Sequence, residues 1–328
     1  MRVAILDDYQ RVALASADWT RLDAAEVRPF HGHIADTADL AAELRGFDVI
    51  VAMRERTAFT AGRIRLLPDL RLLVTTGMWN ASIDMAAAAA AGVTVCGTRG
   101  SGAATSELTW ALILALLRHV PEEDRRIREG GWQQTIGFGL RGRTLGVVGL
   151  GNIGRQVASV GLAFGMEVLA WSQNLSAARA QEAGVRAVAK DDLFSVADVI
   201  TVHYKLSERS VGLVGERELG LMKPTAFLVN TSRGPIVDQD ALLAVLHSAS
   251  IAGAGLDVYD EEPLPGGHPI RMAPRTVLTP HLGYVTDDGY RTFYADAVED
   301  IAAFAAGEPV RVLGTGPRRT GPRRTGPS

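Results

Sequence analysis

Residues 145–154 read Leu-Gly-Val-Val-Gly-Leu-Gly-Asn-Ile-Gly, and this stretch decides the fold of the chain. Its first four residues are mainly apolar and predict a buried strand of a parallel sheet. Gly149, Gly151 and Gly154 follow at the spacing GxGxxG, and residues 155–164 continue as a helix. A strand, a glycine turn and a helix in this order are typical of a dinucleotide-binding unit.

Each glycine of this motif has a physical task. Gly149 permits the tight turn, Gly151 lets the backbone approach a pyrophosphate, and Gly154 lets the helix pack closely on the strand. The N–H groups at the start of the helix then face the phosphates. We therefore expect NAD or NADP as the cofactor, bound by Gly149, Gly151, Asn152, Ile153 and Gly154. The alternative is a glycine turn in an α/β domain that binds no nucleotide.

The choice between NAD and NADP depends on the end of the next strand. An acidic residue at that position binds the adenosine ribose and repels a 2′-phosphate. Here the strand ends Ala-Trp-Ser-Gln-Asn, so Ser172 replaces the acid. The nearest arginine is Arg179. We expect Ser172 to contact the cofactor, the choice to stay open, and both cofactors to be used with weak discrimination.

Short apolar strands alternate with alanine- and leucine-rich helices along the whole chain. This alternation predicts parallel sheets covered by helices on both faces. There are too many strands for one sheet of ordinary size. The fold class is therefore α/β, with two doubly wound, Rossmann-like or flavodoxin-like domains. The expected strands are Val3–Leu6, Asp48–Ala52, Leu70–Thr75, Val93–Cys96, Leu145–Val148, Glu167–Ala170, Val199–His203, Phe227–Asn230, Ala252–Asp257 and Val277–Thr279.

The two domains are expected to be nested. Residues 97–103 are rich in glycine and serine and precede a long helix at 104–119, which marks the first crossing. A second helix, 288–306, carries the chain back. We thus expect a dinucleotide-binding domain, 101–287, inserted into a discontinuous substrate domain, 1–100 plus 288–314. The repetitive tail, 315–328, is rich in Pro, Gly and Arg and is expected to be disordered.

Three segments carry polar side chains directly after predicted strands. They read Val229-Asn-Thr-Ser-Arg-Gly234, Gly255-Leu-Asp-Val-Tyr-Asp-Glu-Glu-Pro263 and Thr279-Pro-His-Leu-Gly283. Ligands of open α/β sheets bind outside the carboxyl ends of the strands, so the three segments are expected to meet near the glycine turn.

Their chemistry suits the reduction of a 2-keto acid. Arg233 can bind the carboxylate and the carbonyl oxygen through a bidentate guanidinium. An imidazole titrates near neutral pH, so His281 can donate the proton that the alkoxide needs. Glu262 can fix the tautomer of that imidazole. Taken singly, these residues could equally be a helix-terminal arginine, a solvated acid and a turn histidine; together they point to catalysis.

From about Ile50 to Leu313 the chain resembles the D-isomer-specific 2-hydroxyacid dehydrogenases, the family of formate, D-glycerate (hydroxypyruvate) and D-3-phosphoglycerate dehydrogenases. The resemblance rests on the glycine motif and the three segments in this order. It implies a D-specific hydride transfer at C2 with Arg233, Glu262 and His281 as the catalytic set. The further cofactor-binding residues that it implies are Thr231, Ser232, Asp257 and Gly283.

The first domain shows fainter similarity to the same family. The resemblance implies that Arg54 and the backbone N–H groups around Gly77 and Met78 bind the substrate carboxylate. The sequence departs from the family pattern directly afterwards, where Trp79 replaces a glycine. A bulky side chain there reshapes the pocket. The substrate therefore stays open among glyoxylate, hydroxypyruvate, phosphohydroxypyruvate and branched keto acids, and so does the physiological direction.

Bulk composition narrows the possible partners. The formal net charge is −3, which indicates neither a nucleic acid nor an anionic membrane as a partner. The most apolar stretch, Leu108–Leu117, is too short to span a membrane. One cysteine, Cys96, allows no internal disulfide, and no metal site is expected. We expect a cytoplasmic homodimer that pairs through residues 108–140.

One alternative function has the same sequence signature. Some proteins with this fold retain the catalytic set but act as NAD-sensing scaffolds, in the manner of corepressors. Such proteins differ by a long interaction extension, which is not apparent here. Turnover of keto acids distinguishes the two functions.

Overall fold

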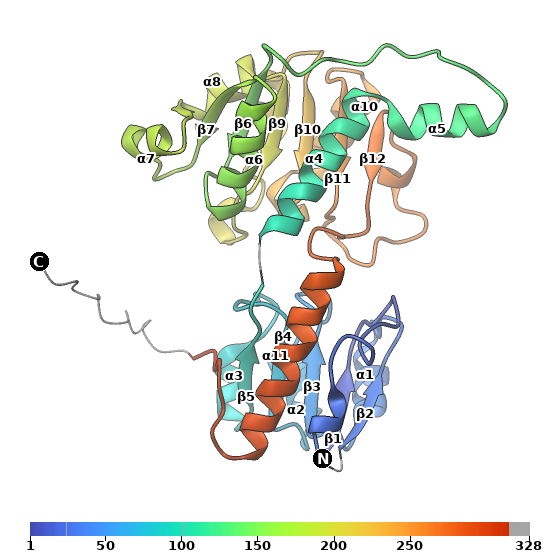
Figure 1. The fold of residues 1–328 in the computed structure, drawn as a ribbon, viewed down its shortest axis with the longest axis vertical. Coiled ribbons are helices and arrows are strands. Elements are labelled where there is room, and N and C mark those ends of the chain that lie inside the picture. Colours follow the sequence, from blue (N-terminus) through green and yellow to red (C-terminus); the bar gives the residue numbers. More distant parts are fainter. Residues whose placement is uncertain (24, 101, 315–328) are drawn as a thin grey trace, which may run out of the picture. The chain divides into compact units, whose positions relative to one another are not determined.

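The computed structural model describes residues 1–23, 25–100 and 102–314, and the chain divides into two compact units. One unit comprises Met1–Gly100 together with the chain from Asp287 onward, and the other comprises Ser101–Thr286. Each unit contains one parallel sheet with helices packed against it (Figure 1). The tail predicted to be disordered, 315–328, lies outside the described residues.

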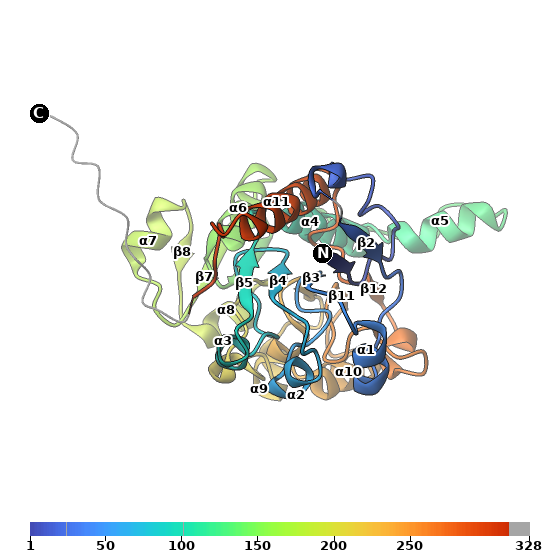
Figure 2. The ribbon, with the colours of Figure 1, turned by 90° about the horizontal axis from the view of Figure 1, so that it is seen from below.

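The discontinuous unit contains a five-stranded sheet in the order β2-β1-β3-β4-β5. Helix α11 covers one face of this sheet, and α1, α2 and α3 cover the other (Figure 2). The elements are β1 (Arg2–Ile5), a 3-10 turn (Trp19–Arg21), β2 (Glu26–Pro29), α1 (Thr37–Glu43), β3 (Val49–Ala52), α2 (Ala61–Arg65), β4 (Leu72–Thr75), α3 (Met85–Ala90), β5 (Thr94–Gly97) and α11 (Asp287–Ala305). The sheet residues Ile50 and Leu73 are fully buried and belong to one apolar core with Leu40 of α1 and Ile64 of α2.

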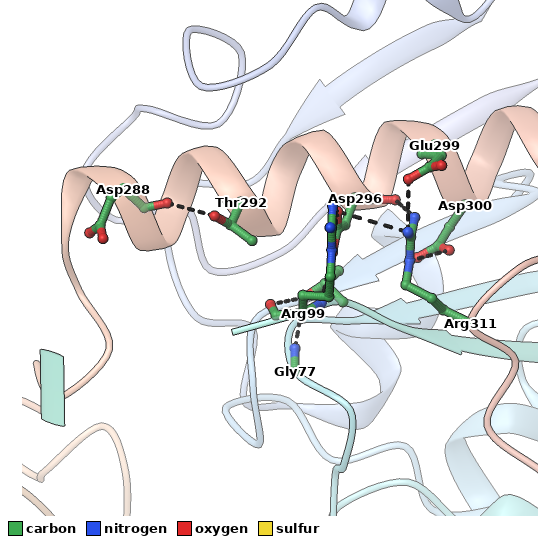
Figure 3. A network of polar contacts seen from close by, with 9 residues as sticks. Gly77, Arg99, Asp288, Thr292, Asp296, Glu299, Asp300 and Arg311 are labelled. Carbon is green, nitrogen blue, oxygen red and sulfur yellow. Dashed lines mark hydrogen bonds and ion pairs between the residues drawn. The ribbon is translucent and has the colours of Figure 1, made fainter. Parts of the chain in front are cut away.

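A network of charged side chains joins α11 to the segment after β5 and to the segment after α11 itself (Figure 3). The guanidinium and backbone N–H of Arg99 donate to Asp296 over 2.6 to 2.7 Å. Arg311 donates to Asp300 over 3.0 Å and to Glu299 over 2.7 Å. Asp296 and Asp300 are both buried. The guanidinium of Arg99 provides the charge that the carboxylate of Asp296 needs.

The inserted unit contains a seven-stranded parallel sheet in the order β12-β11-β10-β9-β6-β7-β8. The reversal of strand order beside β6 is the switch point at which ligands bind in open α/β sheets. Its elements are α4 (Ala103–Leu117), α5 (Val120–Arg128), β6 (Thr144–Val148), α6 (Asn152–Ala163), β7 (Glu167–Trp171), α7 (Ala177–Glu182), β8 (Arg186–Ala187), α8 (Lys190–Val196), β9 (Val199–Val202), α9 (Glu216–Leu221), β10 (Phe227–Asn230), α10 (Gln239–His247), β11 (Gly253–Leu256) and β12 (Thr276–Leu278), with 3-10 turns at Glu208–Ser210, Gly234–Ile236 and Pro269–Met272.

The two faces of this sheet are buried by different helices. Successive strand residues point to opposite faces, so Val147 packs with α4 and α6 while Val148 packs with α8, α9 and α10. Both residues are fully buried. This double cover explains why the strands read as continuous apolar runs, and it confirms the predicted doubly wound class.

The predicted strands are observed with ends shifted by a residue or two, but two strands were missed. Strand β2 lies at a sheet edge and alternates exposed and half-buried residues, and β8 has two residues. The helix predicted over 104–119 ends at Leu117 instead. His119 adopts a left-handed conformation with φ of 54°, and α5 starts after it. No described helix is long and apolar enough to cross a membrane.

Candidate active site

The glycine turn after β6 has the geometry that a dinucleotide needs. Gly149 has φ of 101°, and a Cβ there would lie 2.7 Å from the carbonyl oxygen of His203. A Cβ on Gly154 would lie 2.1 Å from the carbonyl oxygen of Gly149. A Cβ on Gly151 would meet no atom within 4 Å. Helix α6 starts at Asn152 without a side-chain cap, so its first N–H groups are available to a phosphate.

The turn after β10 places Thr231, Ser232 and Arg233. The side chain of Asn230 holds this turn: its Oδ1 accepts the N–H of Ser232, and its Nδ2 donates to the carbonyl of Arg233, both over 3.0 Å. Thr231 is buried, with its hydroxyl 2.8 Å from that of Thr109 on α4. The Ser232 hydroxyl donates to the carbonyl of Tyr204. The backbone of this turn is therefore fixed before any ligand binds.

The side chain of Arg233 starts from a crowded point of the turn. Its Nη1 donates to the carbonyl of Ser232 over 2.7 Å. The next residue, Gly234, lies against the backbone of Tyr259, and a Cβ there would come within 2.0 Å of it. The loops after β10 and β11 are thus in direct contact, as the sequence predicted for two of the three polar segments.

Glu262 and His281 form a hydrogen-bonded pair. The imidazole Nδ1 of His281 lies 2.5 Å from Oε2 of Glu262. The other carboxylate oxygen of Glu262 accepts the N–H of Tyr259 over 2.9 Å. His281 has a φ of 55°, a backbone conformation that residues other than glycine rarely adopt. Such residues cluster at functional sites. The ring of Tyr284 meets that of His281 edge-on, with centroids 5.5 Å apart.

Asp257 has a role that the sequence did not predict. It is fully buried, and its Oδ1 accepts the Thr279 hydroxyl over 2.6 Å and the N–H of Leu282 over 2.7 Å. Its Oδ2 accepts the N–H of Gly283 over 2.9 Å. Burial raises the pKa of Asp257, and these hydrogen bonds oppose that shift. Asp257 therefore holds the turn that presents His281, and its contact with a cofactor stays a prediction.

The residues expected to bind the substrate carboxylate belong to the discontinuous unit. Within that unit Arg54 lies beside Gly77: its Nη1 donates to the carbonyl of Thr76 over 3.3 Å, and a Cβ on Gly77 would lie 2.1 Å from it. The N–H of Gly77, however, donates to the hydroxyl of Thr98 over 2.8 Å. That N–H therefore has an internal acceptor, and substrate binding by the N–H of Met78 stays a prediction.

Comparison with known proteins agrees with this geometry. Residues 110–283 match the sequence model of a protein family, the D-isomer specific 2-hydroxyacid dehydrogenase, NAD binding domain. A glyoxylate reductase of Aeropyrum pernix is 39% identical over 74% of this chain and 75% of its own length. A D-3-phosphoglycerate dehydrogenase of Archaeoglobus fulgidus is 34% identical over 95% of this chain, which spans 58% of that longer relative.

Solved structures show the same similarity. The phosphoglycerate oxidoreductase of Vibrio cholerae O395 has a TM-score of 0.89 and 38% identity, over 94% of this chain and 99% of that one. The family model covers more than half of the chain and contains the glycine turn and the Glu262–His281 pair. The chain therefore belongs to the D-isomer specific 2-hydroxyacid dehydrogenases, a family of NAD-dependent oxidoreductases.

Proposed function

We propose that this protein transfers a hydride between a nicotinamide dinucleotide and C2 of a small 2-keto or 2-hydroxy acid of D configuration. The observation that carries the proposal is the hydrogen bond between Nδ1 of His281 and Glu262, in the same unit as the glycine turn. A carboxylate bonded to Nδ1 fixes one tautomer, and it leaves Nε2 as the nitrogen that exchanges a proton with the substrate oxygen.

The residues of the chain divide the work of the reaction. Bound NADH or NADPH supplies the hydride. Arg233 binds the carboxylate and the carbonyl oxygen of the keto acid, and its charge stabilises the developing alkoxide. His281 gives its proton to that oxygen during reduction and takes it back during oxidation. Glu262 stabilises the protonated imidazole throughout, and Asp257 keeps the His281 turn in place.

We further propose that the discontinuous unit is the substrate domain. Arg54 and the N–H of Met78 contribute to binding the carboxylate, since the N–H of Gly77 already donates to Thr98. Trp79 is 56% exposed and directly follows Met78. An indole at this point favours a substrate with a small substituent at C2. Glyoxylate and hydroxypyruvate are therefore proposed ahead of branched keto acids, in line with the relatives named glyoxylate reductase.

Oxidation of NADH and NADPH by a panel of acids tests this function. The panel contains glyoxylate, hydroxypyruvate, phosphohydroxypyruvate and a branched keto acid, and acetaldehyde serves as the control without a carboxylate. We expect turnover with at least one keto acid and no turnover with acetaldehyde. From every acid of the panel except glyoxylate, whose product is achiral, the product should be the D enantiomer. Tight binding of the cofactor without turnover of any acid would refute the proposed enzymatic function and favour an NAD-sensing scaffold.

We also propose a homodimer that forms through the segment after α4. Trp132 and Ile136 are 71% and 91% exposed. The segment is nevertheless ordered, because Glu123 of α5 accepts the N–H of Thr135 over 2.9 Å. Helix α5 projects from its unit, and the following segment turns back towards β6 (Figure 1). Large apolar side chains held in place and exposed to water are a common sign of a protein interface.

A further inference from the structure

A pocket beside the glycine turn lies at the carboxyl ends of three neighbouring strands, β7, β6 and β9. Its volume is about 310 Å³. Gly149 and Gly151 line it after β6, Ser172 after β7 and His203 after β9. In a dinucleotide-binding unit the adenosine ribose lies at the end of the second strand, which here is β7. This pocket is therefore where we expect the adenosine half of the cofactor.

The chemistry of the pocket does not suit a plain ribose. None of the described residues that line it is acidic. Ser172, at the position of the usual acid, accepts the N–H of Leu150 with its hydroxyl oxygen over 3.0 Å. No described residue accepts the proton of this hydroxyl. Ser172 can therefore donate a hydrogen bond into the pocket, where an aspartate would only accept one.

Two cationic side chains line the same pocket, one in the helix that follows β7 and one in the turn that follows β9. Arg179 lies in the first turn of α7, which Ser176 caps by accepting the N–H of Arg179. Lys205 lies in the turn after β9, where its carbonyl accepts the Ser210 hydroxyl over 2.8 Å. Both side chains are exposed at the rim. Among the described residues, no carboxylate pairs with the guanidinium of Arg179.

The third basic residue of the pocket contributes no charge. Burial lowers the pKa of His203 to about 3, so its imidazole is neutral at physiological pH. The ring Nε2 lies 2.9 Å from the hydroxyl of Thr201. The positive charge of the described lining therefore comes from Arg179 and Lys205, one on each side of the glycine turn.

We propose that Arg179, Lys205 and the Ser172 hydroxyl bind the 2′-phosphate of NADPH, so that this chain prefers NADPH to NADH. The inference rests on the proposed dehydrogenase function and specifies its cofactor. A 2′-phosphate carries up to two negative charges and offers three acceptor oxygens, which match two cations and one hydroxyl donor. One charge-assisted hydrogen bond at an exposed rim corresponds to about a tenfold change in affinity, so two cations predict roughly a hundredfold preference.

Isothermal titration with NADPH and NADH tests the preference without turnover. The wild-type chain should bind NADPH about a hundredfold more tightly than NADH. Arg179→Ala and Lys205→Ala should each weaken NADPH binding by about tenfold and reduce the preference for NADPH by that factor. Arg186→Ala is the matched control, because Arg186 is an exposed arginine on β8 that pairs with Glu167 and does not line the pocket. It should change neither dissociation constant by more than about twofold.

The outcomes separate this inference from the proposed function. Equal affinity of the wild type for NADPH and NADH would overturn the inference. It would also be overturned if Arg179→Ala and Lys205→Ala weakened the binding of NADPH and of NADH by the same factor. A chain that binds NADH more tightly and reduces a keto acid with it would overturn the inference while the dehydrogenase function stands. A chain that binds neither cofactor would overturn both.

Discussion

Nδ1 of His281 lies 2.5 Å from Oε2 of Glu262, and the second oxygen of Glu262 accepts the backbone N–H of Tyr259. Each member of this pair is thus fixed by a neighbour before substrate arrives. Pre-organised acid–base groups need little rearrangement during the reaction, which is the basis of their effect on rate. The relationship leads directly to the first prediction.

His281→Ala should abolish turnover and leave the dissociation constant for the cofactor nearly unchanged, because proton transfer and cofactor binding are separate tasks. Glu262→Gln should leave a slower enzyme whose pH–rate profile for reduction moves to lower pH, since an amide supports a protonated imidazole less well than a carboxylate. His247→Ala, an exposed histidine at the end of α10, is the control. An unchanged pH profile in Glu262→Gln would remove the pair from the mechanism.

Arg233→Ala should lower kcat/KM for every accepted keto acid by a few hundredfold, because a lost charge-assisted contact in the transition state costs about 3 kcal/mol. Arg233→Lys should recover part of this loss, since lysine keeps the charge but not the bidentate geometry. Steady-state kinetics measure both. A loss of less than about tenfold for the alanine variant would mean that a residue other than Arg233 binds the carboxylate of the substrate.

Ser172→Asp should reverse the cofactor preference towards NADH. The new carboxylate accepts hydrogen bonds from the ribose hydroxyls and repels a 2′-phosphate. Gln173→Arg should act in the opposite direction, because it adds a cation next to the same position. The ratio of kcat/KM for NADPH and NADH in the wild type and both variants measures the effect. If Ser172→Asp leaves this ratio unchanged, β7 does not set the choice.

The sequence predicted most of the inserted unit because its signals are local. The apolar strands and the GxGxxG turn each follow from neighbouring residues, and so do the polar residues at the strand ends. The contacts of Asp257 with Thr279, Leu282 and Gly283 join separate strands, so no local pattern reveals that Asp257 holds the His281 turn. The sequence did not predict that Lys205 lines the pocket, for the same reason: only the strand order places the end of β9 beside the glycine turn.

The strands at the edges of the sheets and the loop contacts of the discontinuous unit were harder to predict. The strand β2 alternates polar and apolar residues at an edge, where burial imposes no continuous apolar run. The hydrogen bond from Gly77 to Thr98 joins the ends of β4 and β5, and it occupies a donor that the family resemblance implied for the substrate. Such pairings depend on tertiary contacts that a single sequence does not show.

Asp300 should make folding stability depend on pH. Burial raises the pKa of its carboxyl to about 7, although Arg311 opposes the shift. The folded chain then keeps a proton that the unfolded chain releases at lower pH. The stabilisation from this proton is complete below the unfolded pKa of 3.8 and is lost as the pH rises through about 7.

Asp300→Asn tests this dependence. Between about pH 5 and pH 8 the Tm of the wild type should fall by several degrees relative to the Tm of Asp300→Asn. The control is Glu299→Gln, which removes an exposed carboxylate bound to the same Arg311. Its difference in Tm should change much less between the two pH values, because the charge of Glu299 is the smallest of the causes that shift the pKa of Asp300. Parallel Tm curves for Asp300→Asn and the wild type would contradict the prediction.

Trp132→Ser combined with Ile136→Asp should convert the proposed homodimer into a monomer, because both side chains would leave an apolar interface. Light scattering at micromolar concentration should give about 70 kDa for the wild type, twice the 35.0 kDa of one chain. The variant should give the mass of one chain. Val211→Asp, which replaces a 60% exposed valine elsewhere in the same unit, should stay dimeric. A monomeric wild type would refute the interface.

The central claim is that this chain moves a hydride to C2 of a 2-keto acid. Its most direct test uses a nicotinamide cofactor that carries deuterium at its transferable position, with the keto acid that the panel identifies. Mass spectrometry of the product should find one deuterium at C2, and chiral chromatography of any product with a stereocentre at C2 should find the D enantiomer alone. His281→Ala should give none of this product. Product without deuterium at C2, or with the L configuration, would contradict the account.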